Sequence, residues 1–120
     1  MNLTDQTATL MAGETPVWTA LVTSGREGWE TPTGTFYIGL RVENETMTSE
    51  SLGISPEDEF YHLEDVLFTQ YFTNEGHALH LNYWQPEYVF GNTPTSHGCI
   101  GMFYDDALYF WQALDIGSRV

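Results

Sequence analysis

The chain of 120 residues has the length of one domain, large enough to bury a core but too short for two. Hydrophobic residues make up 42% of it and aromatic residues 15%, too many aromatic side chains for a disordered chain. The 17 acidic and 3 basic residues give a formal net charge of −14, and a field of that sign excludes binding to the phosphate backbone of nucleic acids or to an anionic lipid surface.

The sequence shows no sign of membrane insertion. No apolar run approaches the ~20 residues that a membrane span requires, and no charged-then-apolar signal sequence opens the chain. We therefore predict a single domain over residues 1–120. The acidic surface is expected to keep this domain soluble, and attraction of a cationic partner is the alternative.

The first third of the chain has the pattern of β-strands. Apolar residues among threonines predict a strand over residues 3–12, a turn over 13–16 and a hairpin partner over 17–23. Residues 24–28 indicate a loop, and alternation predicts another strand over residues 35–42. Because the first strand begins so close to residue 1, we expect the domain to be trimmed at both ends.

Residues 43–59 hold six carboxylates among Ser, Thr, Asn, Gly and Pro, which predicts a solvent-exposed, mobile loop. The six are Glu43, Glu45, Glu50, Glu57, Asp58 and Glu59. They lack the spacing of an EF-hand, so no calcium site is predicted. One cysteine and four widely spread histidines give no familiar zinc spacing either. We therefore expect no metal and no other cofactor.

Aromatic residues between positions 61 and 72 predict a pair of strands leading to His80. Most such side chains belong to a core, and those nearest His80 are expected to wall a substrate cleft. We assign Tyr71, Tyr83 and Trp84 to that cleft. His77 is expected at the surface.

The last segment predicts a helix. Asp105 or Asp106 could serve as its N-cap, and Gly117 could end it. Its apolar face comprises Ala107, Leu108, Phe110, Trp111 and Leu114. The alternating runs and this helix together indicate a mainly β fold with one short C-terminal helix.

The stretch Thr95-Ser96-His97-Gly98-Cys99-Ile100 holds the only cysteine of the chain. A lone cysteine cannot form an internal disulfide, and it could be a buried thiol that behaves as a small hydrophobic side chain. The neighbouring Pro, Thr, Ser and Gly residues instead indicate a loop or strand end, where binding groups concentrate. They favour a nucleophilic cysteine.

A nucleophilic Cys99 needs a base or a positive field nearby, because a thiol with a pKa of ~8.5 is only a few per cent thiolate at neutral pH. His97 would face the same side as Cys99 in an extended segment, whereas His80 could approach from a separate segment. Both are candidates for the base. The N–H groups of Gly98 and Cys99 could point at a developing oxyanion.

These residues resemble the signature of the L,D-transpeptidase catalytic domain, in which a histidine is followed by Ser/Thr-His-Gly-Cys and an aliphatic residue. Here 15 residues separate His80 from Ser96-His97-Gly98-Cys99-Ile100. Thr23-Ser24-Gly25 and Glu30-Thr31-Pro32-Thr33-Gly34-Thr35-Phe36 resemble an early stretch of the same family. Ala78-Leu79-His80 with Trp84 resembles its histidine segment, and residues 105–118 fit its helix and turn.

The resemblance implies a β-sandwich of two packed sheets, with the C-terminal helix after the catalytic cysteine. It implies an acyltransferase of cell-wall biogenesis that cross-links peptidoglycan stem peptides through a thioester and that carbapenem β-lactams acylate. Such an enzyme acts outside the cytoplasm, in the cell wall or periplasm, so a targeting sequence is expected elsewhere than in this segment.

The resemblance also implies roles for single residues. Cys99 would be the nucleophile and His80 the general base, oriented by the backbone carbonyl of Leu81. Ser96 and His97 would shape the loop, and the amides of Gly98 and Cys99 would form the oxyanion hole.

Three positions depart from the family pattern. Gly101 stands where Asn or Arg is usual, Leu81 where Gly or Ser is common, and Tyr83 where a small residue often lies. These departures leave two alternatives to cross-linking. One is a peptidoglycan L,D-carboxypeptidase-like hydrolase, and the other is a catalytically weakened module that binds the cell wall.

Overall fold

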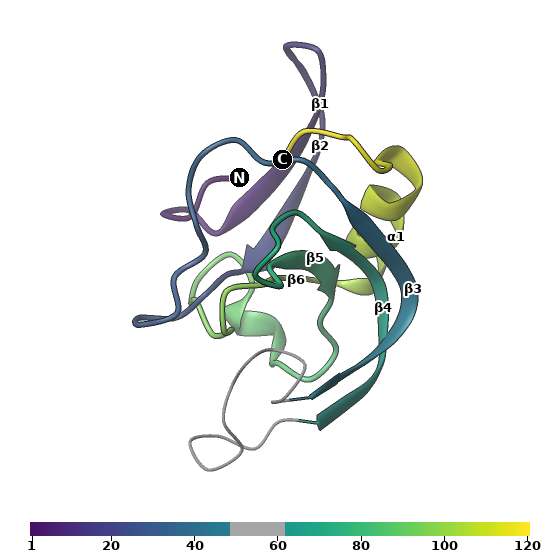
Figure 1. Ribbon diagram of the computed structural model, residues 1–120. Helices are drawn as coiled ribbons and strands as arrows, with labels where there is room; N and C mark the ends of the chain where they lie inside the picture. The colour runs from purple at the N-terminus through teal and green to yellow at the C-terminus, as the bar shows by residue number, and fades with distance from the viewer. Residues whose placement is uncertain (49–61) are drawn as a thin grey trace.

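The computed structural model describes residues 1–48 and 62–120. The strands in these residues are β1 (Thr7–Ala12), β2 (Thr15–Thr23), β3 (Leu40–Thr48), β4 (His62–Tyr71), β5 (Ala78–Leu81) and β6 (Ile100–Met102). The helices are the short 3-10 helix η1 (Glu87–Val89) and α1 (Tyr104–Ala113). The strands lie in the order β1-β2-β6-β5-β4-β3, in which β5 and β6 are parallel and the other neighbours antiparallel (Figure 1). The predicted mainly β class is confirmed.

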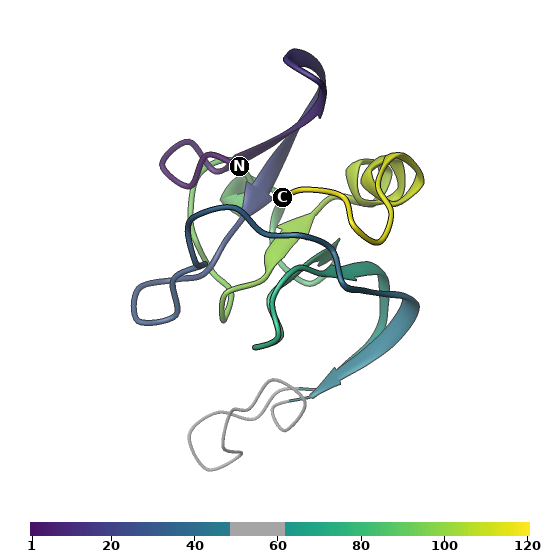
Figure 2. The same ribbon diagram turned by 45° about the horizontal axis from the view of Figure 1, so that its top comes forward.

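β1 and β2 form the predicted hairpin, which projects from the rest of the molecule (Figure 2). Ala12 pairs with Thr15, so the turn has two residues and is shorter than predicted. Gly13, the first of them, has a φ of +63°, which glycine adopts without steric cost. The first strand begins at Thr7 instead of residue 3, because Gln6 has a φ of +55° and interrupts the extended backbone.

β2 connects the β1–β2 hairpin to the remaining strands, because different segments of β2 pair with β1 and with β6. Residues 15–21 of β2 pair with β1, whereas Val22 and Thr23 pair with Met102 and Gly101 of β6. β2 thus carries the chain from the hairpin to the strands that hold the candidate site. The two groups of strands are therefore connected through β2.

β3 and β4 form a long curved antiparallel pair (Figure 1). The loop predicted over residues 43–59 is therefore wrong for residues 43–48, which belong to β3. Glu43 and Asn44 are exposed there, so these polar residues cover the outer face of a strand. Residues 49–59 lie outside the described residues. The strand pair predicted to lead to His80 is formed by β4 and β5, which are antiparallel.

The strand predicted over residues 35–42 is displaced, because β3 begins at Leu40. The segment before it pairs with the end of the chain instead. The amide of Phe36 donates to the carbonyl of Val120 at 3.1 Å, and the amide of Ile38 donates to that of Ser118 at 3.0 Å. These bonds satisfy a backbone that would otherwise lack partners.

α1 packs on the sheet mainly against β4 and β5, and its residues Ala107 and Phe110 belong to the buried core. The predicted C-terminal helix is thus present and follows β6 in the chain. No helix within residues 1–48 and 62–120 is long and apolar enough to span a bilayer.

The ends of α1 differ from the prediction. Its N-cap position is Phe103, without a side-chain cap, and Asp105 and Asp106 lie in the first turn, where the positive end of the helix dipole favours acidic groups. Asp106 also accepts a hydrogen bond from Nε1 of Trp18 at 2.8 Å, which ties the helix to β2. The helix ends at Ala113, before the turn that contains Gly117.

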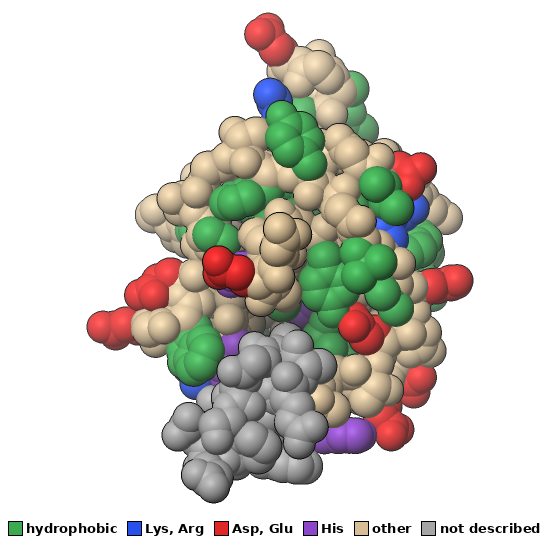
Figure 3. All heavy atoms as spheres, viewed as in Figure 1, with side chains coloured by type: hydrophobic (Ala, Val, Ile, Leu, Met, Phe, Trp, Pro, Cys, Tyr) green, Lys and Arg blue, Asp and Glu red, His purple; other side chains and the backbone are tan. Residues whose placement is uncertain are grey.

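The surface in view carries scattered Asp and Glu side chains and few basic ones, in line with the net charge of −14 (Figure 3). One of the three arginines, Arg41 of β3, lies 3.8 Å from the centre of the Trp111 ring and 3.3 Å from the carboxylate of Asp115. It links β3 to the C-terminal helix and the turn beyond it. Arg41 therefore has a structural role away from the candidate site.

Candidate active site

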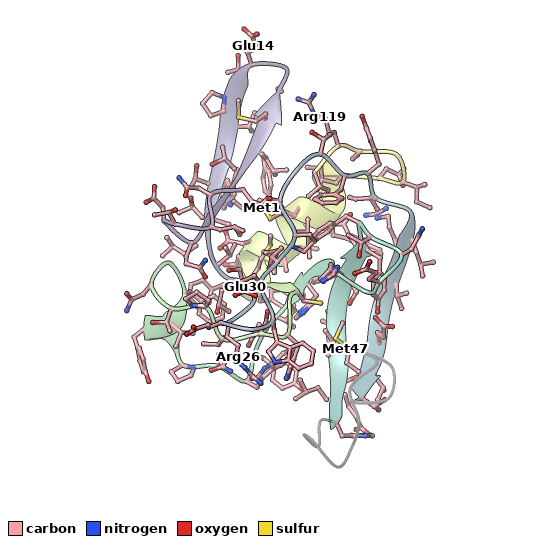
Figure 4. All side chains as sticks on the ribbon, turned by 60° about the vertical axis from the view of Figure 1, so that its left-hand side comes forward. Met1, Glu14, Arg26, Glu30, Met47 and Arg119 are labelled. Carbon is pink, nitrogen blue, oxygen red and sulfur yellow. The ribbon has the colours of Figure 1, made fainter. Side chains whose placement is uncertain are left out.

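The parallel pairing of β5 with β6 brings the two parts of the motif together. His80 lies opposite Gly101, and Cys99 immediately precedes β6. Both His80 and Cys99 open onto a cavity of about 230 Å³. Its lining residues are Arg26, Met47, His80, Asn82, Trp84, Gln85, Thr95, Ser96, His97 and Cys99. Figure 4 labels two of them, Arg26 from the loop after β2 and Met47 from β3.

His80 is 2% exposed, and its Nδ1 lies 2.6 Å from the carbonyl oxygen of Leu81. Because a carbonyl can only accept, Nδ1 carries the proton and Nε2 is left as an acceptor. Burial lowers the pKa of His80 to about 4, although the bond to Leu81 acts in the opposite direction. Trp84 stacks on the ring at 5.7 Å between centroids. His80 is thus a neutral imidazole held in one tautomer.

Cys99 is 8% exposed, and its Sγ donates to the carbonyl oxygen of Gly76 at 3.4 Å. Burial raises the pKa of its thiol to about 11, a hydrogen bond with the backbone of Ala78 lowers it, and the charge of Glu45 raises it further. At neutral pH the pair is therefore a neutral thiol and a neutral imidazole. A base must remove the thiol proton during the reaction, because no thiolate is preformed.

Ser96 closes the loop before Cys99. Its hydroxyl donates to the carbonyl of Cys99 at 2.6 Å and accepts from the amide of Gly98 at 3.1 Å. Gly98 has a φ of +121°, which side-chain-bearing residues rarely adopt. One of the two amides expected to form an oxyanion hole, that of Gly98, is thus already bonded to Ser96.

The early motif of the sequence packs directly against this loop. The hydroxyl of Thr31 donates to the carbonyl of Gly98 at 2.7 Å and accepts from the amide of Gly25 at 3.0 Å. A Cβ on Gly25 would lie 2.0 Å from the carbonyl oxygen of Trp29 and 2.9 Å from Cα of Gly98. Gly25 is therefore required for the two loops to approach each other. Thr31 holds the backbone of Gly98 in place against the loop of Gly25.

Two further histidines flank the loop. His97 lines the cavity and meets the Trp29 ring edge-on at 5.1 Å between centroids. His77, expected at the surface, is instead half-buried beside Gly98. A Cβ added to Gly98 would lie 2.7 Å from the imidazole ring of His77. Nδ1 of His77 lies 2.7 Å from the hydroxyl of Thr73. The surface prediction for His77 is corrected, because the turn after β4 folds this residue back towards the loop.

The three aromatic residues assigned to the cleft occupy different places. Trp84 lines the cavity. Tyr83 is 53% exposed, donates to the carbonyl of Glu64 at 2.6 Å and touches the edge of Trp84 from outside the cavity. Tyr71 donates to the carboxylate of Glu45 at 2.7 Å and lines a separate hollow of about 450 Å³. Trp84 therefore lies in the cavity of His80 and Cys99 and Tyr83 outside it, whereas Tyr71 lines a hollow bordered by Gly76, whose carbonyl accepts from the Cys99 thiol.

Sequence analysis did not identify Asn82 or Arg26 as lining residues. Asn82 follows His80 by two positions, and the period of two in extended backbone places such residues on one face, so this spacing could have indicated it. Arg26 lies in a predicted loop with no such periodicity. The departure at position 101 is also explained, because a Cβ on Gly101 would lie 2.8 Å from both Cβ and Nδ2 of Asn82.

No cluster of three or more His, Cys, Asp or Glu side chains able to hold a metal ion occurs in the described part of the chain. The titratable and polar groups that line the cavity include the thiol of Cys99, the imidazoles of His80 and His97 and the amide of Asn82.

Comparison with known proteins relates this geometry to a family. The model of the YkuD family, the L,D-transpeptidase catalytic domain, matches residues 1–120. A curated relative, "Probable L,D-transpeptidase 3" of Mycobacterium tuberculosis (strain ATCC 25618 / H37Rv), is 31% identical over 96 residues, which are 80% of this chain and 35% of that protein.

Solved structures resemble the whole described fold. An L,D-transpeptidase from Mycobacterium smegmatis has a TM-score of 0.88 at 25% identity, covering 98% of this chain and 54% of the other. L,D-transpeptidase 3 from Mycobacterium tuberculosis, in complex with a faropenem-derived adduct, has a TM-score of 0.83 at 25% identity, covering 98% of this chain and 56% of the other. This chain thus spans about half the length of these proteins or less. Its sequence and fold show that the chain belongs to the L,D-transpeptidase catalytic domain family.

Proposed function

We propose that this protein is an L,D-transpeptidase-type cysteine acyltransferase that cross-links peptidoglycan stem peptides outside the cytoplasm, where peptidoglycan lies. The observation that carries the proposal is the shared cavity of His80 and Cys99, in which Leu81 holds His80 in the tautomer of a base. Membership of the L,D-transpeptidase family supports it. Both reacting groups are neutral and buried, so the thiol proton must pass to the imidazole during the reaction.

In the proposed first step, Sγ of Cys99 attacks the carbonyl carbon between the third residue of a stem peptide and its terminal D-alanine. The thiol proton passes to Nε2 of His80 as the carbon–sulfur bond forms. Collapse of the tetrahedral intermediate breaks the carbon–nitrogen bond, and His80 returns the proton to the leaving amine. The products are free D-alanine and a thioester at Cys99.

In the second step, an amine of a neighbouring stem attacks the thioester carbonyl. The amine gives a proton to His80, the carbon–sulfur bond breaks and the sulfur of Cys99 regains a proton. One peptide bond is broken and one is formed, so the two steps together need no external energy source and no cofactor. Water in place of the amine would make the same site a hydrolase.

In this structure the thiol of Cys99 donates a hydrogen bond to the carbonyl of Gly76. The side chain must therefore turn towards His80 when substrate binds. Catalytic hydrogen bonds often tighten only in the substrate complex. Arg26 also lines this cavity. The same site is proposed to accept β-lactams, in line with the faropenem-derived adduct in the Mycobacterium tuberculosis structure.

The test is a product assay with a disaccharide-tetrapeptide, with and without a second stem peptide as acceptor. We expect release of D-alanine and a cross-linked dimer, both lost in Cys99→Ala and strongly reduced in His80→Ala. A tripeptide product without dimer would instead assign hydrolysis. Binding to purified peptidoglycan without D-alanine release, from folded and reduced protein, would contradict the enzymatic proposal.

A further inference from the structure

Asn82, two positions after His80, is a buried polar residue that also lines the cavity. It directly follows β5, its amide N–H donates to the carbonyl of Met102 at 2.9 Å, and the residue is 4% exposed. The backbone bond fixes its position between the last residues of β5 and β6. Asn82 shares the cavity with His80 and Cys99.

The orientation of the Asn82 side chain follows from one hydrogen bond. The amide of Gln85 donates to its Oδ1 at 3.1 Å, and because a backbone N–H can only donate, the oxygen must lie at this end. Nδ2 lies at the other end and has no hydrogen-bond partner within residues 1–48 and 62–120. Nδ2 is not fully enclosed by protein, and Asn82 lines the cavity, so this donor is open to a molecule bound there. A largely buried amide donor without a protein partner costs free energy, and a hydrogen bond from Nδ2 to a bound molecule would remove that cost.

Gly101 provides the space that this side chain occupies. A Cβ at position 101 would lie 2.8 Å from Cβ and 2.8 Å from Nδ2 of Asn82, closer than non-bonded carbon and nitrogen atoms approach. Any side chain at position 101 would therefore displace the Asn82 amide. The two residues form a matched pair across the parallel strands that carry the site.

We propose that Asn82 is a substrate-binding residue, whose Nδ2 donates a hydrogen bond to a backbone carbonyl oxygen of the donor stem peptide, with Gly101 as the residue that makes room for it. The inference rests on the proposed function. A neutral amide donor suits a neutral peptide carbonyl, and the peptide that reaches Cys99 must bring such carbonyls into this cavity. A site built to hydrogen-bond a substrate group loses rate when its donor is removed.

The test compares variants that separate the donor from the structural role of Asn82. Asn82→Asp keeps the oxygen that accepts from Gln85 and nearly keeps the volume, but it replaces the donor with an acceptor. We expect kcat/KM for D-alanine release from a disaccharide-tetrapeptide to fall at least about tenfold at pH 7. Asn92→Asp, at an exposed position, adds the same charge and is expected to leave kcat/KM unchanged.

Alkylation of Cys99 by iodoacetamide controls for an electrostatic effect on the thiol. This small reagent reports the availability of the thiolate without the contacts of a stem peptide, so its rate should fall less than kcat/KM does. For Asn82→Asp, the ratio of variant to wild-type kcat/KM should also rise towards one as the pH falls and the introduced carboxyl becomes protonated. A protonated carboxyl can donate the hydrogen bond that the carboxylate cannot. A purely structural role would give neither pattern.

Gly101→Ala provides a second variant without added charge. Its methyl group should displace the Asn82 amide and lower the same kcat/KM, which covers the case in which Asn82→Asp does not fold. Unchanged kcat/KM in a folded Asn82→Asp protein would overturn the assignment of Asn82 while leaving the proposed function intact. A wild-type protein that releases no D-alanine would overturn the proposed function itself, and the assignment with it.

Discussion

The carbonyl oxygen of Leu81 lies 2.6 Å from Nδ1 of His80, so a single backbone group determines which nitrogen of the imidazole can act as a base. Because the contact involves the backbone, it does not depend on the side chain at position 81. This explains how leucine can stand where a small residue is common in the family. The departure at Leu81 therefore leaves the orientation of His80 in place.

Burial of His80 predicts a specific loss of stability in acid. Its pKa is lowered from 6.5 to about 4, so between these values the unfolded chain binds more protons than the folded protein and stability falls as the pH falls. The size of this effect is up to about 3 kcal/mol. His80→Gln cannot titrate, so its free energy of unfolding should fall less than that of the wild type between pH 6.5 and 4. Parallel pH dependences in urea unfolding would contradict a buried neutral His80.

The thiol of Cys99 is predicted to react as a thiol with a raised pKa. With a pKa of about 11, its alkylation by iodoacetamide should keep rising about tenfold per pH unit from pH 7 to 10. The alkylation rate of the urea-denatured protein should level off near the ordinary thiol pKa of ~8.5. A folded protein whose alkylation rate levelled off below pH 8 would instead contain a preformed thiolate.

Thr31 is predicted to stabilise the cysteine loop. Thr31→Val keeps the shape but leaves the carbonyl of Gly98 and the amide of Gly25 without their buried partner, which should cost about 2 kcal/mol or more of unfolding free energy. Thr33→Val, at an exposed position, is the matched control and should change stability by less than about 0.5 kcal/mol. Equal stabilities of the two variants would show that the bonds of Thr31 contribute nothing.

The close approach of Asn82 and Gly101 predicts a measurable coupling. Gly101→Ala should destabilise the protein by about 1–3 kcal/mol, because the new methyl group overlaps the Asn82 side chain. In an Asn82→Gly background the same change should cost at least about 1 kcal/mol less. Additive effects in this double-mutant cycle, measured by urea unfolding, would rule out the contact. Gly101→Asn alone is expected to destabilise the protein for the same reason.

The local parts of the site were predictable from the sequence. The Pro, Thr, Ser and Gly residues before Cys99 indicate a loop, and the resemblance links that loop to His80 and to the carbonyl of Leu81. The pairing of Asn82 with Gly101 was not predictable, because it depends on the register of β5 against β6. The roles of Thr31 and His77 depend likewise on loops that meet only in the folded chain.

Errors in the predicted elements have a similar origin. Residues 43–48 were assigned to a loop because their carboxylates and amides suggest solvent, whereas pairing with β4 makes them a strand that exposes Glu43 and Asn44 and buries Met47. Tyr83 was assigned to the cleft because it lies near His80 in sequence. Its side chain turns outwards to the carbonyl of Glu64, and that contact is determined by β4.

The central claim is that Cys99 is an acyl-accepting nucleophile, and the most direct measurement is intact-protein mass spectrometry after incubation with a carbapenem, followed by peptide mapping. We predict a stoichiometric adduct of the antibiotic's mass on the peptide that contains Cys99, absent from Cys99→Ala and formed more slowly by His80→Ala. No adduct on folded, reduced wild-type protein, or an adduct that persists in Cys99→Ala, would contradict the claim.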